Sequence, residues 1–484
     1  MLKQRALTAT IWSGADIFLR QGLQLAVAIA LARLLSPNDF GIVALLALFT
    51  GIATVLVDGG FSAALIQNQN VDHADESTVF WFNLAIGVAA AIAMLFIAPL
   101  AAAFYSQPVL VPLMGLMALN VILGSLGAIH RTLLTKQLNF RLQMLIGVVA
   151  AVVSGAVAIG MARNGFGVWA LAVQIVVMTA VSTTLSWWWH HWRPRLVWSA
   201  ASVRKLFGFG GYHLGSSLLD IVYIRLYTML IGRLYSPREL GFYNNADTTA
   251  QLPGGFLTGV LARVALPMFS VSSNDSAKLR RGMQLSVRGM MLLNAPMMLG
   301  MAAVTEPLTR TLFGSQWLPA VPILRVLCLA GVLLPLHVIN LNVLLAQGHS
   351  RLMFRLEMTK KVVGVTFICA GAFFGVMGIA WSQVAFSAVA FIINAHYSQR
   401  YLTYGVFAQL RDFLPGLCVS VVMAGFVYVT STSTRWKAAP AVELLVLVSA
   451  GSVFFLAGVW LLRLKALHDV IALFRPSHLS ASAP

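Results

Sequence analysis

Charged side chains are scarce in this sequence. Asp, Glu, Lys and Arg make up 10% of the 484 residues, whereas 59% are hydrophobic. Soluble globular domains contain about a quarter charged residues, so the composition excludes a soluble enzyme. The mean hydropathy is +0.83, and a spanning helix needs about 20 apolar residues. We therefore expect an all-α polytopic membrane protein with about fourteen transmembrane helices.

Cysteine and the common catalytic motifs are also missing or rare. The three cysteines lie inside apolar runs and form no CxxC or Cys/His spacing, which argues against a disulfide framework and a metal site. The dipeptide Gly-Lys does not occur, so no P-loop for ATP is present, and neither HExxH nor GxSxG is found. We expect no catalytic residue, no metal and no cofactor. An ion gradient, or the gradient of the substrate itself, would then drive any transport.

The apolar runs are separated by short polar breaks, none long enough to fold as a soluble domain. Asp16 and Arg20 interrupt the first run, which argues against a cleavable signal peptide and favours a retained span. The predicted spans are residues 11–34, 41–65, 78–104, 109–129, 142–162, 167–189, 207–232, 240–268, 284–304, 320–345, 356–375, 378–398, 413–430 and 441–462.

The few charges are strongly basic. The net charge is +18, from 33 Lys and Arg against 15 Asp and Glu. In a membrane protein this excess indicates loops that face anionic lipids, and we expect no nucleic-acid partner. Most Lys and Arg fall in alternate connections, which predicts that both termini are cytoplasmic. Residues 67–77 are an exception, because this connection should be cytoplasmic but carries only acidic charge.

A nine-residue motif occurs twice. The sequence RLLSPNDFG at residues 33–41 recurs as RLYSPRELG at residues 233–241, each time between the first and second span of a half. A chance match of turn residues is the alternative. Since six spans separate the copies, a true repeat predicts two parallel six-helix lobes around a central cavity, a known transporter design. We expect these lobes at residues 1–205 and 206–402, and two additional helices with a cytoplasmic tail at residues 403–484.

Several further stretches carry a family resemblance. They are residues 58–61 (DGGF), 78–83 (TVFWFN), 133–141 (LLTKQLNFR), 236–246 (SPRELGFYNNA) and 313–320 (FGSQWLPA). In combination the chain resembles the multidrug/oligosaccharidyl-lipid/polysaccharide (MOP) exporter superfamily, in its branch of Wzx-type exopolysaccharide flippases.

The resemblance implies a flippase of the bacterial inner membrane. It would translocate an undecaprenyl-diphosphate-linked exopolysaccharide repeat unit to the periplasmic leaflet by alternating access, with possible H⁺ or Na⁺ coupling. A polymerase and export machinery of the same pathway are possible partners. The alternatives are a cation-coupled multidrug or other lipid exporter of the same fold, a membrane-embedded polysaccharide biosynthesis enzyme, and a non-transporting scaffold.

Polar residues recur along one face of several predicted spans, where burial in lipid is costly. Asp16, Arg20 and Gln24 are spaced by four in the first span. The other stripes are Thr50, Thr54 and Asp58; Ser216, Asp220, Tyr223 and Tyr227; Asn244, Asp247 and Gln251; and His337, Asn340 and Gln347. Together they predict a hydrated cavity. The alternative is that each stripe is a buried structural lock.

Cations slightly outnumber anions within the spans, which favours an anionic substrate over cationic drugs. Arginine presents forked donors that match a phosphate group. The predicted diphosphate contacts are Arg20, Arg225, Arg263 and Arg325. The residues predicted to set the cavity field or couple ions are Asp16, Asp58, Asp220 and Asp247. The residues predicted for sugar contact or packing are Tyr223, Tyr227, Tyr243 and Asn244.

Three other segments have two interpretations each. Residues 187–195 (WWWHHWRPR) indicate an aromatic belt with a basic loop, or a site where Arg193 and Arg195 gather anionic head groups. Residues 58–60 and residues 253–255 carry Gly-Gly, which indicates either a broken helix beside a cavity or tight helix packing.

Overall fold

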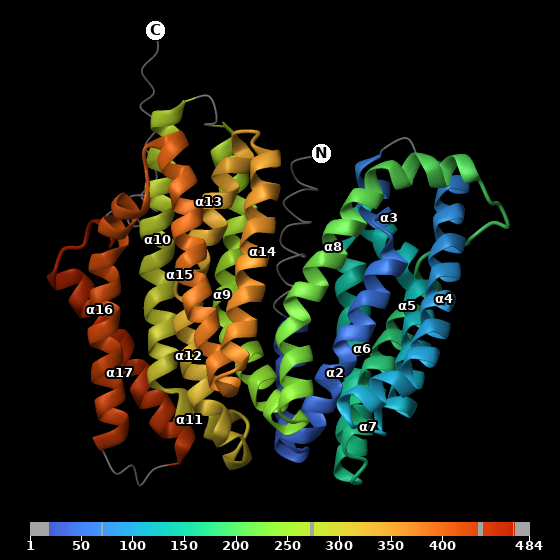
Figure 1. The fold of residues 1–484 in the computed structure, drawn as a ribbon, viewed down its shortest axis with the longest axis horizontal. Coiled ribbons are helices and arrows are strands. Elements are labelled where there is room, and N and C mark those ends of the chain that lie inside the picture. The colour runs from blue at the N-terminus through green and yellow to red at the C-terminus, as the bar shows by residue number, and fades with distance from the viewer. Residues whose placement is uncertain (1–18, 69–70, 272–274, 434–438, 468, 470–484) are drawn as a thin grey trace. The chain divides into compact units, whose positions relative to one another are not determined.

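The computed structural model describes residues 19–68, 71–271, 275–433, 439–467 and 469 (Figure 1). Every regular element in these ranges is a helix, as the sequence predicts. A helix over residues 19–34 comes first. It is followed by α2 (Pro37–Asp58), α3 (Phe61–Gln67), α4 (His73–Tyr105), α5 (Leu110–Lys136), α6 (Phe140–Arg163), α7 (Val168–Trp189), α8 (Ala200–Leu234), α9 (Pro237–Val271), α10 (Ser276–Ala303), α11 (Thr305–Leu312), the 3₁₀ helix η1 (Ser315–Ala320), α12 (Val321–Gly331), α13 (Leu334–Ala346), α14 (Ser350–Ala372), α15 (Gly375–Leu402), α16 (Val406–Ser433) and α17 (Pro440–Leu461).

The predicted count of fourteen spans is not confirmed. Within the described residues, 10 helices are long and apolar enough to cross a membrane, or 11 if α10 and α11, bent by 74°, form one broken span. The first predicted span lies partly outside the described residues. Helix α14 is missing from the count because Arg355, Glu357, Lys360 and Lys361 crowd its first half.

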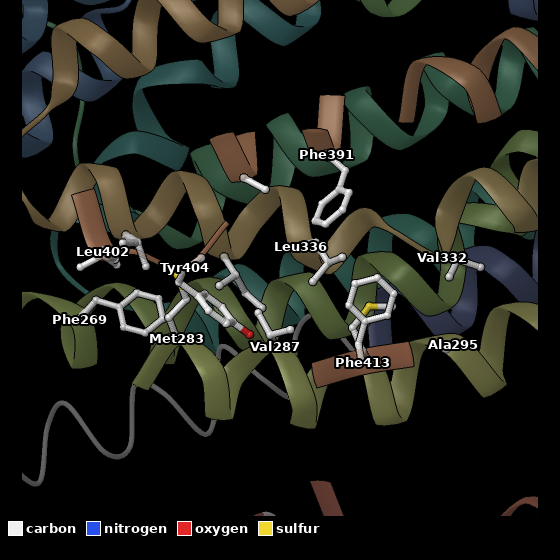
Figure 2. Close-up of a cluster of buried hydrophobic side chains, with 14 of the residues drawn as sticks. Phe269, Met283, Val287, Ala295, Val332, Leu336, Phe391, Leu402, Tyr404 and Phe413 are labelled. Atoms are coloured by element: carbon white, nitrogen blue, oxygen red, sulfur yellow. The ribbon is translucent and has the colours of Figure 1, made fainter. Parts of the chain in front are cut away.

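The chain forms two compact units, residues 1–244 and 245–484, called here the N-terminal and C-terminal units. The largest core of the C-terminal unit joins α10, α13, α15 and α16, and Figure 2 shows Val287, Leu336, Phe391 and Phe413 within it. In the N-terminal unit, one apolar cluster centres on Phe61 and Phe80 and another on residues 27–35 with α6 and α7. The three-part division at residues 205 and 402 stays a prediction.

The repeated motif lies at two helix starts that contact each other in the N-terminal unit. In the first copy Ser36 caps α2: its hydroxyl accepts from the Asp39 amide at 3.3 Å, while the Asp39 carboxylate accepts from the Ser36 amide at 3.0 Å. In the second copy the Glu239 amide donates to the Ser236 hydroxyl at 3.2 Å. A Cβ on Gly41 would overlap the carbonyl oxygen of Pro237, and a Cβ on Gly241 would overlap that of Pro37. The two copies thus pack reciprocally, as related repeats do.

The two Gly-Gly segments behave differently. Helix α2 ends at Asp58 because Gly59 and Gly60 have φ of 55° and 75°, a left-handed conformation that favours glycine. Helix α9, in contrast, runs without a break through residues 253–255. A Cβ on Gly254 would lie 2.9 Å from Leu334. The first segment is therefore a broken helix, and the second allows tight packing.

Candidate functional site

A polar cavity lies inside the N-terminal unit, beside the break between α2 and α3. Its volume is about 250 Å³. The lining side chains come from four helices: Thr54, Val57 and Asp58 from α2, Ser62 from α3, Asn120, Val121, Gly124, Ser125, Ala128, Arg131 and Thr132 from α5, and Thr179 from α7. Most of them are polar, which is unusual inside a spanning bundle and marks a functional candidate.

The helix break places Asp58 in this cavity. Asp58 is the last residue of α2, and its carboxylate is only half-buried. The carbonyl groups of a helix C-terminus carry partial negative charge. An anionic side chain at this position therefore needs a nearby cation or water.

Arg131 supplies the cation. Its guanidinium attracts the Asp58 carboxylate electrostatically, and its Nη2 donates to the Gly124 carbonyl at 3.3 Å. The predicted span ends at residue 129 and leaves Arg131 in the following connection, whereas α5 continues to Lys136 and carries Arg131. The signal available in the sequence was the opposite charge on Asp58, which lies at the end of another span.

Hydroxyl groups and one amide complete the cavity. The Ser62 and Thr132 hydroxyls are 2.8 Å apart, which joins α3 to α5. Thr54 and Ser125 bond back to carbonyls of their own helices, at 2.7 Å each. Asn120 Oδ1 is buried and has no hydrogen-bond partner among the described residues. Such an atom is costly to leave unpaired, so it favours a water or a ligand group in the cavity.

This arrangement can bind a small group that carries negative charge and hydroxyls. The arginine fork suits a phosphate oxygen pair, and the carboxylate and hydroxyls suit sugar hydroxyls. The volume is below the roughly 300–1,000 Å³ of pockets that enclose a whole drug-sized ligand. The cavity therefore has room for one head group, for ions or for water.

Among the predicted site residues that the structure describes, Asp58 alone lines this cavity. Arg20, Asp220, Tyr223 and Arg225 are half-buried elsewhere in the N-terminal unit. The Nε of Arg225 is buried without a hydrogen-bond partner in the described part of the chain. Asp16 lies outside the described residues, so its pairing with Arg20 stays a prediction.

Two of the four predicted sugar contacts are packed together. Tyr227 and Tyr243 are 8% and 1% exposed, and their ring centroids are 4.8 Å apart. Asn244 follows on α9 and is half-buried. This geometry favours the packing alternative for the two tyrosines.

The remaining predicted residues lie in the C-terminal unit. Asp247 accepts from Gln251 Nε2 at 2.8 Å, one turn along α9. Arg325 donates to the Ala302 carbonyl and the Thr305 hydroxyl, each at 3.3 Å. These bonds tie α12 to the bend between α10 and α11. The Arg263 side chain is not among those that the structure describes.

Asn340, in the stripe of the predicted tenth span, belongs to a buried network. Asn340, Ser398 and Gln409 are each 0% exposed. Asn340 Oδ1 accepts from Ser398 Oγ at 2.6 Å and from Gln409 Nε2 at 3.0 Å, and Asn340 Nδ2 donates to Gln409 Oε1 at 3.1 Å. His337 is 3.2 Å from the Ser387 hydroxyl. Asn340 is thus a structural lock and does not line a hydrated cavity.

The tryptophan-rich segment closes one end of the N-terminal unit. Arg193 donates to the carbonyls of Trp187, His190 and Trp192 at 2.5 to 2.7 Å. It therefore caps α7, and its guanidinium is directed at the protein, which favours the structural interpretation. The indole of Trp192 donates to Glu76 Oε2 at 2.7 Å.

Comparison with proteins of known sequence places this chain among polysaccharide biosynthesis proteins. Teichuronic acid biosynthesis protein TuaB of Bacillus subtilis is 27% identical over 412 residues, 84% of this chain and 85% of that protein. Succinoglycan biosynthesis transport protein ExoT of Rhizobium meliloti is 27% identical over 409 residues, 83% and 82% of the two chains. Lipopolysaccharide biosynthesis protein WzxC of Escherichia coli is 26% identical over 389 residues, 78% and 77%.

Comparison with solved structures shows the fold. The lipid II flippase MurJ in an inward closed conformation has a TM-score of 0.78 at 14% identity, over 95% of this chain and 100% of that chain. An inward-facing MATE family transporter of the MOP superfamily has a TM-score of 0.61 at 12% identity, over 82% and 100%. A family model described as "polysaccharide biosynthesis protein" matches residues 30–322, more than half of the sequence. The chain therefore belongs to this family of polysaccharide biosynthesis proteins and has the MOP superfamily fold.

Proposed function

We propose that this protein is a flippase that moves a lipid-linked oligosaccharide repeat unit across the membrane by alternating access. The observation that carries the proposal is the cavity with Asp58 and Arg131, in a chain of this family and fold. Among the relatives, ExoT is named a transport protein and Agl15 of Haloferax volcanii a probable flippase, so the chain is a transporter and not an enzyme.

The finer features of the proposal come from the sequence. The substrate lipid is an undecaprenyl diphosphate, the membrane is the bacterial inner membrane, and both termini are cytoplasmic. Arg20, Arg225, Arg263 and Arg325 remain the proposed diphosphate contacts, and Arg131 joins them. Undecaprenyl diphosphate carries its charge on phosphate oxygens, which the forked donors of arginine match.

The cavity offers a route for ion coupling. When an anionic substrate group binds Arg131, it neutralises the positive charge that stabilises the Asp58 carboxylate. A cation, H⁺ or Na⁺, bound at Asp58 restores the balance, so the anion and the cation strengthen each other's binding. This linkage is reciprocal by thermodynamic necessity. Asp220 and Asp247 remain further candidates for the same role.

The test follows the sidedness of the glycolipid. A strain deleted for this gene is complemented with the wild type, Arg131→Gln or Asp58→Asn, and lipid-linked oligosaccharide is probed with a membrane-impermeant glycosidase. We expect the deletion strain to accumulate completed repeats that are protected from the glycosidase. Complementation with the wild type should clear these repeats. Arg131→Gln loses a charge-assisted hydrogen bond to the substrate, worth about 1.5–3 kcal/mol. It should therefore clear the repeats about tenfold or more slowly than the wild type does.

Arg400→Gln is the matched control, because Arg400 is exposed at the end of α15 and lines none of the described cavities. It should clear repeats at the wild-type rate. Normal sidedness and normal polymer in the deletion strain would contradict the flippase, and raised drug sensitivity there would favour a multidrug exporter. Truncated repeats would indicate a biosynthetic enzyme.

A further inference from the structure

A second polar region lies in the C-terminal unit, where α10 begins, α15 leads into α16 and the chain leaves α17. Two adjoining clefts of about 590 and 610 Å³ share Arg280, Gln284 and Arg288. The larger cleft, called here the basic cleft, is also lined by Ala408, Arg411, Asp412, Pro415, Gly416, Leu462, Arg463, Leu464, Lys465 and Ala466.

One arginine at the base of the basic cleft is fully neutralised. Arg288 bonds to Asp412 Oδ1 at 2.6 Å and to Asp469 Oδ2 at 3.0 Å. The Tyr404 hydroxyl donates to Asp412 Oδ2 at 2.7 Å. The two carboxylates of the region are thus directed at Arg288, and the three side chains together carry a net charge of −1.

The other cations of the basic cleft have no acidic partner. Arg280 donates to a neutral group, the Thr403 hydroxyl, at 2.9 Å. Arg411, Arg463 and Lys465 are exposed, and none forms an ion pair with an acidic side chain of the described residues. Together these four cations exceed the one surplus negative charge of the Arg288 cluster, so the region keeps a net charge of +3. Such an arrangement attracts a group with at least one negative charge.

The backbone after α17 brings two of these cations to the cleft. Arg463 has a φ of 46°, a left-handed conformation that side-chain-bearing residues seldom adopt. The turn is held by a hydrogen bond from the Leu464 amide to the Val459 carbonyl at 3.3 Å, and Leu464 packs against the core between α16 and α17. The chain thus turns where α17 ends, and Arg463 and Lys465 on this turn line the cleft.

The basic cleft continues into an apolar, exposed surface. On α16, Leu414, Val421 and Val422 are 47%, 54% and 59% exposed. At the end of α17, Trp460 and Leu462 are 71% and 64% exposed. Tryptophan at the end of a span is typical of the membrane interface. A head group in the cleft would therefore have its acyl chains beside a lipid-facing helix.

We propose that the basic cleft binds the phosphate of an anionic membrane phospholipid, with the acyl chains along α16. Arg411, Arg463 and Lys465 contact the phosphate oxygens, and Arg280 lines the inner wall. Basic pockets between spanning helices on the cytoplasmic side bind anionic head groups in other membrane proteins. This end of the unit is the one that the distribution of Lys and Arg assigns to the cytoplasm. The site does not depend on the flippase activity.

The experiment measures lipid retention by the purified full-length protein. The protein is placed in nanodiscs of phosphatidylcholine in which about one lipid in five is phosphatidylglycerol, an anionic phospholipid. It is then released into detergent, and the lipids that stay bound are counted by native mass spectrometry. We expect the wild type to retain phosphatidylglycerol preferentially. In the triple variant Arg411→Gln/Arg463→Gln/Lys465→Gln, the ratio of retained phosphatidylglycerol to retained phosphatidylcholine should fall about tenfold or more.

The matched control is Arg141→Gln/Arg204→Gln/Arg400→Gln. These three cations are also exposed, belong to segments with the same expected sidedness and line none of the described clefts. The control removes the same charge and should retain phosphatidylglycerol as the wild type does. Equal loss in both triple variants would overturn the site in favour of general surface charge, and wild-type retention by the cleft variant would overturn it directly.

Two competitors identify the source of the phosphate. Inorganic phosphate in the millimolar range should not displace phosphatidylglycerol, because it lacks the acyl chains. Displacement by inorganic phosphate would show a free-anion site and overturn the lipid assignment. Undecaprenyl diphosphate at equimolar concentration should also leave the bound phospholipid in place, and displacement would assign the cleft to the substrate lipid.

Discussion

Gly41 and Gly241 bring two helix starts closer than any residue with a Cβ allows. Gly41 lies in the second turn of α2, and its missing side chain leaves room for the carbonyl of Pro237 at the first position of α9. Gly241 leaves the same room for Pro37. We predict that Gly41→Ala destabilises the N-terminal unit, because the added methyl group meets backbone and no flexible side chain. Pro237 is the first residue of α9, so its carbonyl is oriented along the helix and cannot rotate away without disturbing the first turn.

The magnitude follows from two opposing terms. Inserting a methyl group into a packed contact costs typically about 1–3 kcal/mol, and a backbone obstacle places this case near 3 kcal/mol. Alanine is favoured over glycine in a helix by about 1 kcal/mol. The net loss is about 2 kcal/mol, or roughly 4–8 °C in melting temperature at about 2–4 °C per kcal/mol for a domain of this size.

The assay is a thermal melt of the full-length protein in detergent, followed by tryptophan fluorescence. Gly160→Ala is the control, because Gly160 also lies in a helix of the N-terminal unit but a Cβ there would meet nothing within 4 Å. It should raise the melting temperature slightly. Gly241→Ala should resemble Gly41→Ala, and the double variant should lose less than the sum, since one separation of the helix starts relieves both overlaps. A Gly41→Ala protein as stable as the Gly160→Ala protein would refute the close approach.

Three further predictions concern the buried polar contacts. Asn340→Leu leaves Gln409 Oε1 and the Ser398 hydroxyl without their Asn340 partner in the core and should lower stability by about 1–3 kcal/mol, measured in the same melt; an unchanged melting temperature would contradict the lock. Burial, with His191 and Arg193 nearby, lowers the pKa of His190 below 6.5. The folded protein then binds fewer protons there, so stability is full above pH 6.5 and falls below it. His190→Gln should flatten this fall in stability below pH 6.5, which thermal melts at a series of pH values on both sides of 6.5 would show. Trp192→Phe removes a charge-assisted bond to Glu76 and should cost roughly 1.5–3 kcal/mol, whereas wild-type stability would show that packing alone holds the segment.

The helical class and the internal repeat could be predicted from the sequence, because they depend on local composition and spacing. Long apolar runs specify spanning helices wherever the solvent is lipid. The match between residues 33–41 and 233–241 predicted related helix starts, and the structure shows them in reciprocal contact. The position of Asp58 beside a polar cavity also follows from a local signal, the two glycines that end α2.

The partners of polar residues could not be predicted, because they lie far away in the sequence. Asn340 and Asp58 stand in similar stripes on apolar helices, yet Asn340 is satisfied by Ser398 and Gln409, 58 and 69 residues away. Periodicity within one helix contains no information about such neighbours. Arg131 has a partner of the same kind: its guanidinium attracts Asp58 on another helix, and hydropathy, which ends the predicted span at residue 129, contains no information about this neighbour.

What separates a lock from a binding site in this protein is whether its hydrogen-bonding capacity is used. Arg288 has two carboxylates, and Asp412 has a tyrosine hydroxyl in addition. Removing one member of such a saturated set leaves a charge unpaired, so the set holds the helices together. Arg131 makes one long bond to a carbonyl beside an open cavity, and Asn120 Oδ1 there has no partner in the described residues. These donors and acceptors retain capacity for a ligand, and for this reason we place the transported group at Asp58 and Arg131 and not at Arg288.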